Sequence, residues 1–150
     1  MSEATDESPP SCSPSPASLA RTRIAVSIKQ PWATLVVHGL KTIGLRRWRP
    51  RVRGLVYIHT GASADPCEEG WSRVPESLAR FAQLRRGLVG RVVLGDVKRY
   101  DTLEQFHADR DCHLAPERWF GEGGLFGWSL SNPERVPFEP CPGNLRFFRV

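Results

Sequence analysis

The chain has 150 residues with 21 Lys or Arg against 16 Asp or Glu, so its formal net charge is +5 and its length allows one compact domain with a tail. Its apolar runs are far too short to cross a membrane, and the acidic start lacks the apolar segment of a secretory signal. Cys12, Cys67, Cys112 and Cys141 are scattered and form no Cys-x-x-Cys pair, which argues against a zinc ribbon or a disulfide framework and favours a reducing, cytoplasmic setting.

Residues 1–22 are predicted to be a disordered tail rich in serine and proline. Between Ser8 and Ala20 there are five serines and four prolines, and Leu19 is the only large apolar residue. Residues 1–20 carry three acids and no Lys or Arg, so the rest of the chain has 21 bases against 13 acids, a net charge of +8. Such an excess indicates a phosphate-bearing partner or a charge that serves solubility, and composition alone does not separate the two.

The first half of the domain, which is expected to span 23–150, begins with a strand. Apolar and polar residues alternate over 24–28, the period of a half-buried strand. Pro31 is suited to a first helical turn and Gly39 to a helix end, so 31–38 is predicted to be a short helix. Alternation from residue 43 to Trp48 predicts a second strand, and Gly54 opens a third, over 55–60.

The second half is predicted to contain two helices and four strands. A helix over 75–86 is bounded by Pro75 and Gly87, and a capping box of Asp101 and Glu104 begins a helix over 102–109. The expected strands are 88–97, 125–130, 135–138 and 145–150. Many short strands with few helices predict an α+β fold, a small and mostly antiparallel β-barrel with a few short flanking helices.

The densest functional signal is the segment 39–53, which holds six basic residues around Trp48. In a strand, Arg46 and Trp48 point to the same face, where a guanidinium and an indole suit a phosphate and a stacked base. Alternation ends at Pro50, so Arg51 and Arg53 are placed on a loop. The alternative is a solvated charged edge that prevents strands of different molecules from pairing.

The motif Ser-Ile-Lys-Gln-Pro-Trp-Ala at 27–33, followed by Gly-Leu-Lys at 39–41 and Arg46-x-Trp48, resembles the ASCH domain, the activating-signal-cointegrator homology family. The resemblance covers nearly all of the chain after the tail. It implies a PUA-like β-barrel whose cleft, between the first helix and the sheet, is lined by the pattern G-x-K-x-x-E-x-R. Lys41 and Arg46 match that pattern, whereas Gly44 stands where the family usually has Glu.

What the resemblance implies about function is binding of RNA or single-stranded nucleic acid. Loss of the carboxylate at Gly44 makes the cleft more positive and favours binding over catalysis. Small bacterial relatives hydrolyse acylated cytidine with a Lys at the position of Lys41, a Thr at the position of Gly44 and an acid in a later helix, here Glu104 or Asp111. The missing hydroxyl argues against that activity in this chain.

The remaining candidates each have a structural alternative. Gln30 precedes the first helix, where its amide suits either a base edge or the capping of that helix. His59 is a partly buried structural residue or, beside Lys41, a general base for a ribose hydroxyl. Cys112 and His113 could bind a metal together with Cys67 and Cys141, but no two of these residues have the spacing of a zinc-finger ligand pair. Neither a metal nor a cofactor is therefore expected.

The sequence therefore predicts a module that holds single-stranded RNA, or a modified nucleotide, in a basic cleft, with no membrane partner. The binding residues are expected to be Lys29, Gln30, Trp32, Lys41, Arg46, Trp48, Arg51 and Arg53. The alternative is a small metal-independent hydrolase on the same fold, a ribonuclease or a nucleoside amidohydrolase, with Lys41 and His59 as its catalytic candidates.

Overall fold

The computed structural model describes residues 23–121 and 124–150, so the predicted tail lies outside the described residues. The strands are β2 (Ile24–Ser27), β3 (Ile43–Arg46), β4 (Gly54–Thr60), β5 (Gly87–Tyr100), β6 (Leu125–Pro140) and β7 (Phe147–Arg149). The helices are α2 (Trp32–Val37), α3 (Glu68–Trp71), α4 (Leu103–Ala108) and α5 (Arg110–His113), with 3₁₀ turns η1 (Glu76–Leu78), η2 (Phe81–Gln83) and η3 (Glu117–Trp119). No helix in this part of the chain is long and apolar enough to cross a membrane.

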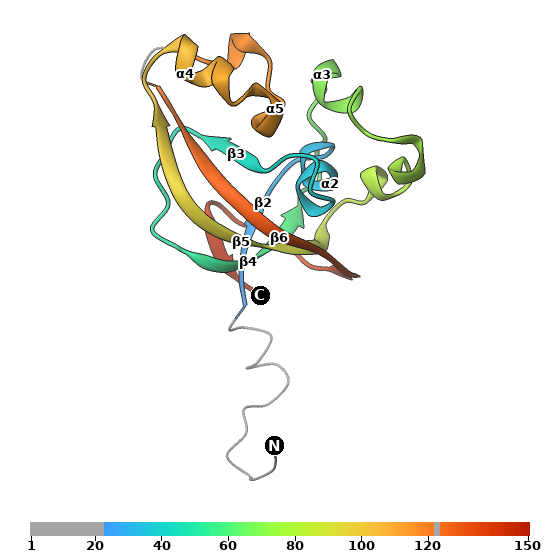
Figure 1. Cartoon of the computed structure of the whole chain (residues 1–150). Coiled ribbons are helices and arrows are strands. Elements are labelled where there is room, and N and C mark those ends of the chain that lie inside the picture. The colour runs from blue at the N-terminus through green and yellow to red at the C-terminus, as the bar shows by residue number, and fades with distance from the viewer. Residues whose placement is uncertain (1–22, 122–123) are drawn as a thin grey trace.

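All six strands form one mixed sheet in the order β3-β6-β5-β4-β2-β7. The pairing of β2 with β4 is parallel and the other four pairings are antiparallel. The long strands β5 and β6 bend across the molecule, and α4 and α5 lie together near the end where β5 stops and β6 starts (Figure 1). The α+β class and the mostly antiparallel sheet with short helices are thus confirmed.

Helix α2 lies in the core of the domain, because every one of its residues is buried. Val36 and Val37 pack with Ile58 and Val89 of the sheet in the main apolar cluster. The contact is so close that a Cβ at Gly90 would lie 2.5 Å from a Val37 methyl carbon, which explains a glycine in the middle of β5. The predicted helix at 31–38 is confirmed within one residue, and Gly39 ends it with φ +76°.

The predicted strands at 125–130 and 135–138 are in fact one strand, β6. Asn132-Pro133 is typical of a turn, yet it lies within β6, where Asn132 has φ +49° and the register with β5 shifts nearby. Proline is tolerated there because β3 pairs only with residues 126–129. Beyond residue 130, the edge of β6 that faces away from β5 has no neighbouring strand, so the missing N–H of proline breaks no ladder hydrogen bond there.

The predicted helix over 75–86 is wrong, because this segment forms two separate 3₁₀ turns, η1 and η2. Phe81 and Ala82 of η2 are buried, whereas Leu78 of η1 is only half-buried. The single turn η2 therefore supplies the buried side chains of this segment. The helix predicted at 102–109 exists as α4, but its capping box is one residue later. The Gln105 N–H donates to Thr102 Oγ1 (3.2 Å), and Gln105 Oε1 accepts from the Thr102 N–H (3.1 Å).

Candidate nucleic-acid-binding cleft

A cavity of about 180 Å³ lies where β2 leads into α2 and α2 leads into β3. Chain connectivity explains its composition, since Lys29 follows β2, Trp32 begins α2, and Lys41 and Arg46 flank and end β3. Asp65 and Trp119 reach the same cavity from distant segments. We call this cavity the Lys41 cleft, with Lys29, Trp32, Lys41, Arg46, Asp65 and Trp119 as its functional lining.

Lys41 is the most unusual residue of the cleft, because its side chain is only 5% exposed. Its ammonium group donates to the His113 carbonyl and lies 4.8 Å from the centre of the Trp32 ring. Burial, and then the nearby positive charge of Arg46, lower the pKa of Lys41 to about 7. The amine therefore exists in both protonation states near neutral pH.

Arg46 is half-buried and is fixed by its backbone neighbours rather than by an acid. Its guanidinium donates to the Ser27 carbonyl (2.7 Å) and lies 5.9 Å from the centre of the Trp128 ring. Burial lowers the pKa of Arg46 below its ordinary value, yet a guanidinium stays charged at neutral pH. The cleft thus holds a permanent positive charge beside the titratable Lys41.

Asp65 is the one acid of the cleft, and both of its carboxylate oxygens are occupied. Oδ2 accepts from Trp32 Nε1 (2.9 Å) and Oδ1 accepts from the Cys67 N–H (2.9 Å). No ion pair joins Asp65 to Lys41 or Arg46 among the described residues. The carboxylate therefore orients the Trp32 ring, and the edge of that ring meets Trp119 at a centroid distance of 5.1 Å.

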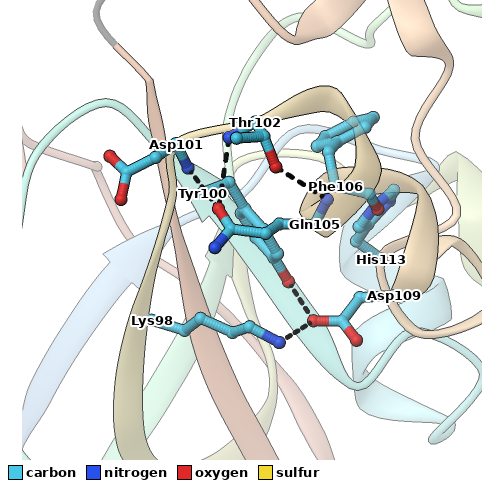
Figure 2. Close-up of polar contacts among 8 residues, drawn as sticks. All are labelled: Lys98, Tyr100, Asp101, Thr102, Gln105, Phe106, Asp109 and His113. Atoms are coloured by element: carbon cyan, nitrogen blue, oxygen red, sulfur yellow. Dashed lines mark hydrogen bonds and ion pairs between the residues drawn. The ribbon is translucent and has the colours of Figure 1, made fainter.

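A polar network around α4 and α5 holds the acceptor of Lys41 in place (Figure 2). The Tyr100 hydroxyl and the Lys98 ammonium donate to Asp109 Oδ2 at 2.6 and 2.7 Å, which ties the helices to β5. The His113 ring is fixed at both nitrogens, by the Phe106 carbonyl (2.8 Å) and the Ala115 N–H (3.0 Å). These bonds anchor α5, the helix whose last carbonyl, that of His113, accepts from Lys41.

Four of the eight predicted binding residues line the cleft, namely Lys29, Trp32, Lys41 and Arg46. Gln30 is fully buried and its amide is used within the fold. Its Oε1 accepts from the N–H and hydroxyl of Thr34 (3.0 and 2.6 Å), and its Nε2 donates to the Phe81 carbonyl (3.2 Å). Gln30 therefore performs the capping role that was the alternative to base recognition.

Trp48, Arg51 and Arg53 are not part of the cleft lining. Strand β3 ends at Arg46, so the alternation expected to align Arg46 with Trp48 stops too early. The Trp48 ring is half-buried, packs against the main core cluster and meets Trp128 edge-to-face at a centroid distance of 4.8 Å. Arg53 donates to nearby carbonyls of its own loop, and Arg51 is exposed on the same loop.

His59 is also absent from the lining of the Lys41 cleft. It is 1% exposed and borders a different cavity at the end of β2 and β4. A general base working with Lys41 on one substrate must share its cavity, and His59 does not.

Sequence reasoning missed two residues of the cleft, Asp65 and Trp119. A signal for Asp65 exists, because it is the first acid after Glu7 and ends a long acid-free, basic stretch. Trp119 stands in the turn η3 between Pro116 and Phe120, more than 70 positions after Lys41. No local pattern links such distant residues, so Trp119 could be placed only by the fold.

Comparisons with known proteins identify the family and the fold. The family model of the ASCH domain matches residues 26–137 of the chain. The crystal structure of ASCH from Zymomonas mobilis is similar at a TM-score of 0.55 and 15% identity, over 80% of this chain and 74% of that one. A serine-to-alanine mutant of the same protein gives a TM-score of 0.57 and 15% identity, over 81% and 75%. These structures support the fold. No curated protein matches the chain.

Proposed function

The chain belongs to the ASCH domain family, and from the Lys41 cleft we propose that it binds single-stranded RNA by taking up one base or modified nucleotide in this cleft. The observation that carries the proposal is the joint placement of Lys41, Arg46 and two tryptophan rings around one small cavity. Cations beside aromatic rings are the combination that single-stranded nucleic acid recognition uses, one for phosphate and the other for the base.

The size of the cleft limits its ligand. At about 180 Å³ it is smaller than the roughly 300–1,000 Å³ of common small-molecule sites. One flat ring fits, while the rest of a polymer must lie outside. Half-buried Trp119 offers the stacking surface, and Trp32, which Asp65 and Lys41 hold in place, forms the floor.

The two cations of the cleft have different tasks in this proposal. Arg46 supplies a permanent charge to a phosphate or to a carbonyl of the base. Lys41, whose pKa is about 7, binds an anionic or carbonyl oxygen best below that pH, when it is an ammonium. Outside the cleft, Arg49 and Arg51 of the loop after β3 extend the positive charge toward a backbone.

A salt titration tests the proposal. Fluorescein-labelled oligouridine and a duplex of equal length are titrated with the protein at several salt concentrations. We expect the single strand to bind more tightly, with a log–log salt slope that Arg46→Gln reduces by about one unit or less. Arg91→Gln is the matched control, because Arg91 is paired with Glu134 (2.7 Å) and is absent from the cleft lining. Equal binding of both nucleic acids, or equal slopes in both variants, would contradict the proposal.

One observation favours a hydrolase as the second candidate. A buried lysine with a pKa of about 7 suits proton transfer at neutral pH, and Asp65 lines the same cleft. The hydroxyl that the bacterial amidohydrolases use is missing at Gly44, which also lines the cleft. Chromatography of the RNA after each titration distinguishes binding from ribonuclease activity, because binding alone returns intact RNA and a ribonuclease yields fragments that vanish with Lys41→Met.

A further inference from the structure

A second cavity, of about 630 Å³ and open to solvent, lies where the parallel strands β2 and β4 end together. Its lining includes Ser27, His59, Arg86, Gly143 and Asn144, and it shares none of these residues with the Lys41 cleft. Parallel pairing explains why Ser27 and His59 meet, since they are register partners at the last position of the β2–β4 ladder.

Ser27 and His59 form a directed hydrogen-bond chain. His59 Nδ1 lies 2.8 Å from Ser27 Oγ, and His59 Nε2 lies 2.9 Å from the Cys141 carbonyl oxygen. A carbonyl only accepts, so Nε2 carries the proton, and Nδ1 of the neutral ring then accepts from the Ser27 hydroxyl. A nucleophile bonded to a base that a third group orients is the arrangement that activates a serine.

Gly143 packs closely against one side of this pair, at the border of the cavity. A Cβ at Gly143 would lie 2.9 Å from Ser27 Oγ and 2.6 Å from His59 Cε1, so only glycine fits there. In the described part of the chain, the N–H groups of Gly143 and Asn144 donate to no backbone carbonyl, so they are available to a ligand oxygen. Arg86 is the one charged residue of the lining, and it stands there without an acid. The cavity therefore suits an anionic substrate.

We propose that Ser27 and His59 are the nucleophile and base of a second site that hydrolyses carboxylic esters bearing a negative charge. Ser27 Oγ bonds to the ester carbonyl carbon while its proton moves to His59 Nδ1. The carbon–oxygen bond to the alcohol then breaks, and the alcohol leaves with that proton. Water attacks the acyl-serine, its proton passes through His59 back to Ser27 Oγ, and the carboxylic acid is released. The sum is ester plus water giving acid plus alcohol.

The test uses an alkyl fluorophosphonate, which bonds through phosphorus to an activated serine and releases hydrogen fluoride. Mass spectrometry of wild-type protein after digestion is expected to find one adduct, on the peptide containing Ser27. Ser27→Ala abolishes it. Ser72→Ala, which removes an exposed serine whose hydroxyl bonds only to the Glu69 carbonyl, is expected to leave the adduct unchanged.

His59→Gln separates base from scaffold, because the glutamine amide can still donate to the Cys141 carbonyl but cannot accept a proton from Ser27. The labelling rate is expected to fall about 100-fold. With substrates, p-nitrophenyl hemisuccinate is expected to be preferred to p-nitrophenyl acetate, and Arg86→Gln to remove that preference. Wild-type protein that forms no adduct on Ser27, or that is labelled no faster than folded His59→Gln, overturns the proposal.

Discussion

Lys41 and Lys98 are the same residue type in opposite environments. Lys98 is 53% exposed, and its ammonium forms an ion pair with Asp109 at 2.7 Å. Lys41 is 5% exposed, and within the described part of the chain its ammonium has a carbonyl and an aromatic ring as partners but no carboxylate. The surface pair adds at most about 1 kcal/mol to stability, whereas an unpaired buried ammonium costs the fold several.

The difference separates a lysine that stabilises the fold from one whose burial costs stability. Lys98 and Asp109 fasten α4 and α5 to β5 (Figure 2), which is a structural task. Lys41 lies in a cavity with a second cation, Arg46, and among the described residues no ion pair joins either cation to an acid. Such a site gains stability when an anion binds, so the comparison yields predictions for both lysines.

The largest effect is expected from the pH dependence of stability with and without Lys41. The folded-state pKa of Lys41 is about 7 and its ordinary value is 10.5. Between these values the unfolded chain binds more protons, so the free energy of unfolding rises with pH, by on the order of 5 kcal/mol at most. Below pH 7 the destabilisation is fully present. Urea denaturation at pH 7 and pH 10 is expected to show this rise in the wild type and its loss in Lys41→Met. Parallel pH profiles would contradict it.

The next effect concerns the network that holds the acceptor of Lys41. Asp109→Ala removes the acceptor of the buried Tyr100 hydroxyl, so unfolding should become easier by roughly 1–3 kcal/mol. Asp101→Ala breaks the exposed pair with Arg99 and is the control, with less than about 1 kcal/mol expected. Denaturant midpoints measure both. A loss of unfolding free energy of similar size in the two variants would mean that Asp109 does not anchor α4 and α5 to β5.

A third effect separates the aromatic wall of the cleft from its charges. Trp119→Leu is expected to weaken oligouridine binding by about 1–3 kcal/mol with little change of the salt slope, because stacking releases no counterions. Trp48→Leu is the control, since half-buried Trp48 packs against the main core cluster and is absent from the cleft lining. Fluorescence anisotropy of folded variants gives both values. A greater loss from Trp48→Leu would place the stacking surface outside the cleft.

The smallest effect is expected on the exposed side of the comparison. Lys98→Met removes a half-exposed ion pair and is expected to change the unfolding free energy by less than about 1 kcal/mol at pH 7. The change should shrink further at high salt, which screens exposed pairs. A larger, salt-independent loss would show that Asp109 depends on Lys98 as much as on Tyr100.

Local patterns predicted the fold well, whereas the turns depended on tertiary context. Alternation located β2 and β3, and Gly39 marked the end of α2. The prediction of a helix over 75–86 was wrong because helical spacing does not reveal which apolar residues become buried. In the structure only Phe81 and Ala82 of this segment are buried, and the short turn η2 is enough to place them. Pro133 predicts a turn from the sequence alone, because the sequence does not reveal that this part of β6 has an unpaired edge on which proline is tolerated.

For the site, sequence reasoning succeeded near the motif and failed beyond it. Lys41 precedes the short strand β3 and Arg46 is its last residue, so their close spacing in the sequence places both at one cleft. Whether Gln30 faces a ligand or caps a helix depends on the Thr34 contacts, which the composition does not show. Trp119 enters from a distant turn, so only the folded chain places it beside Trp32.

The most direct measurement compares Lys41→Met with Lys98→Met in binding to oligouridine from pH 6 to pH 8. Both variants lose one lysine and gain the same side chain, so they differ only in position. We expect wild-type and Lys98→Met affinity to fall as the pH rises through about 7, where Lys41 loses its proton. Lys41→Met should bind more weakly at pH 6 and show no such fall. Equal affinities for the two variants across this range would contradict the assignment of the Lys41 cleft as the nucleic-acid site.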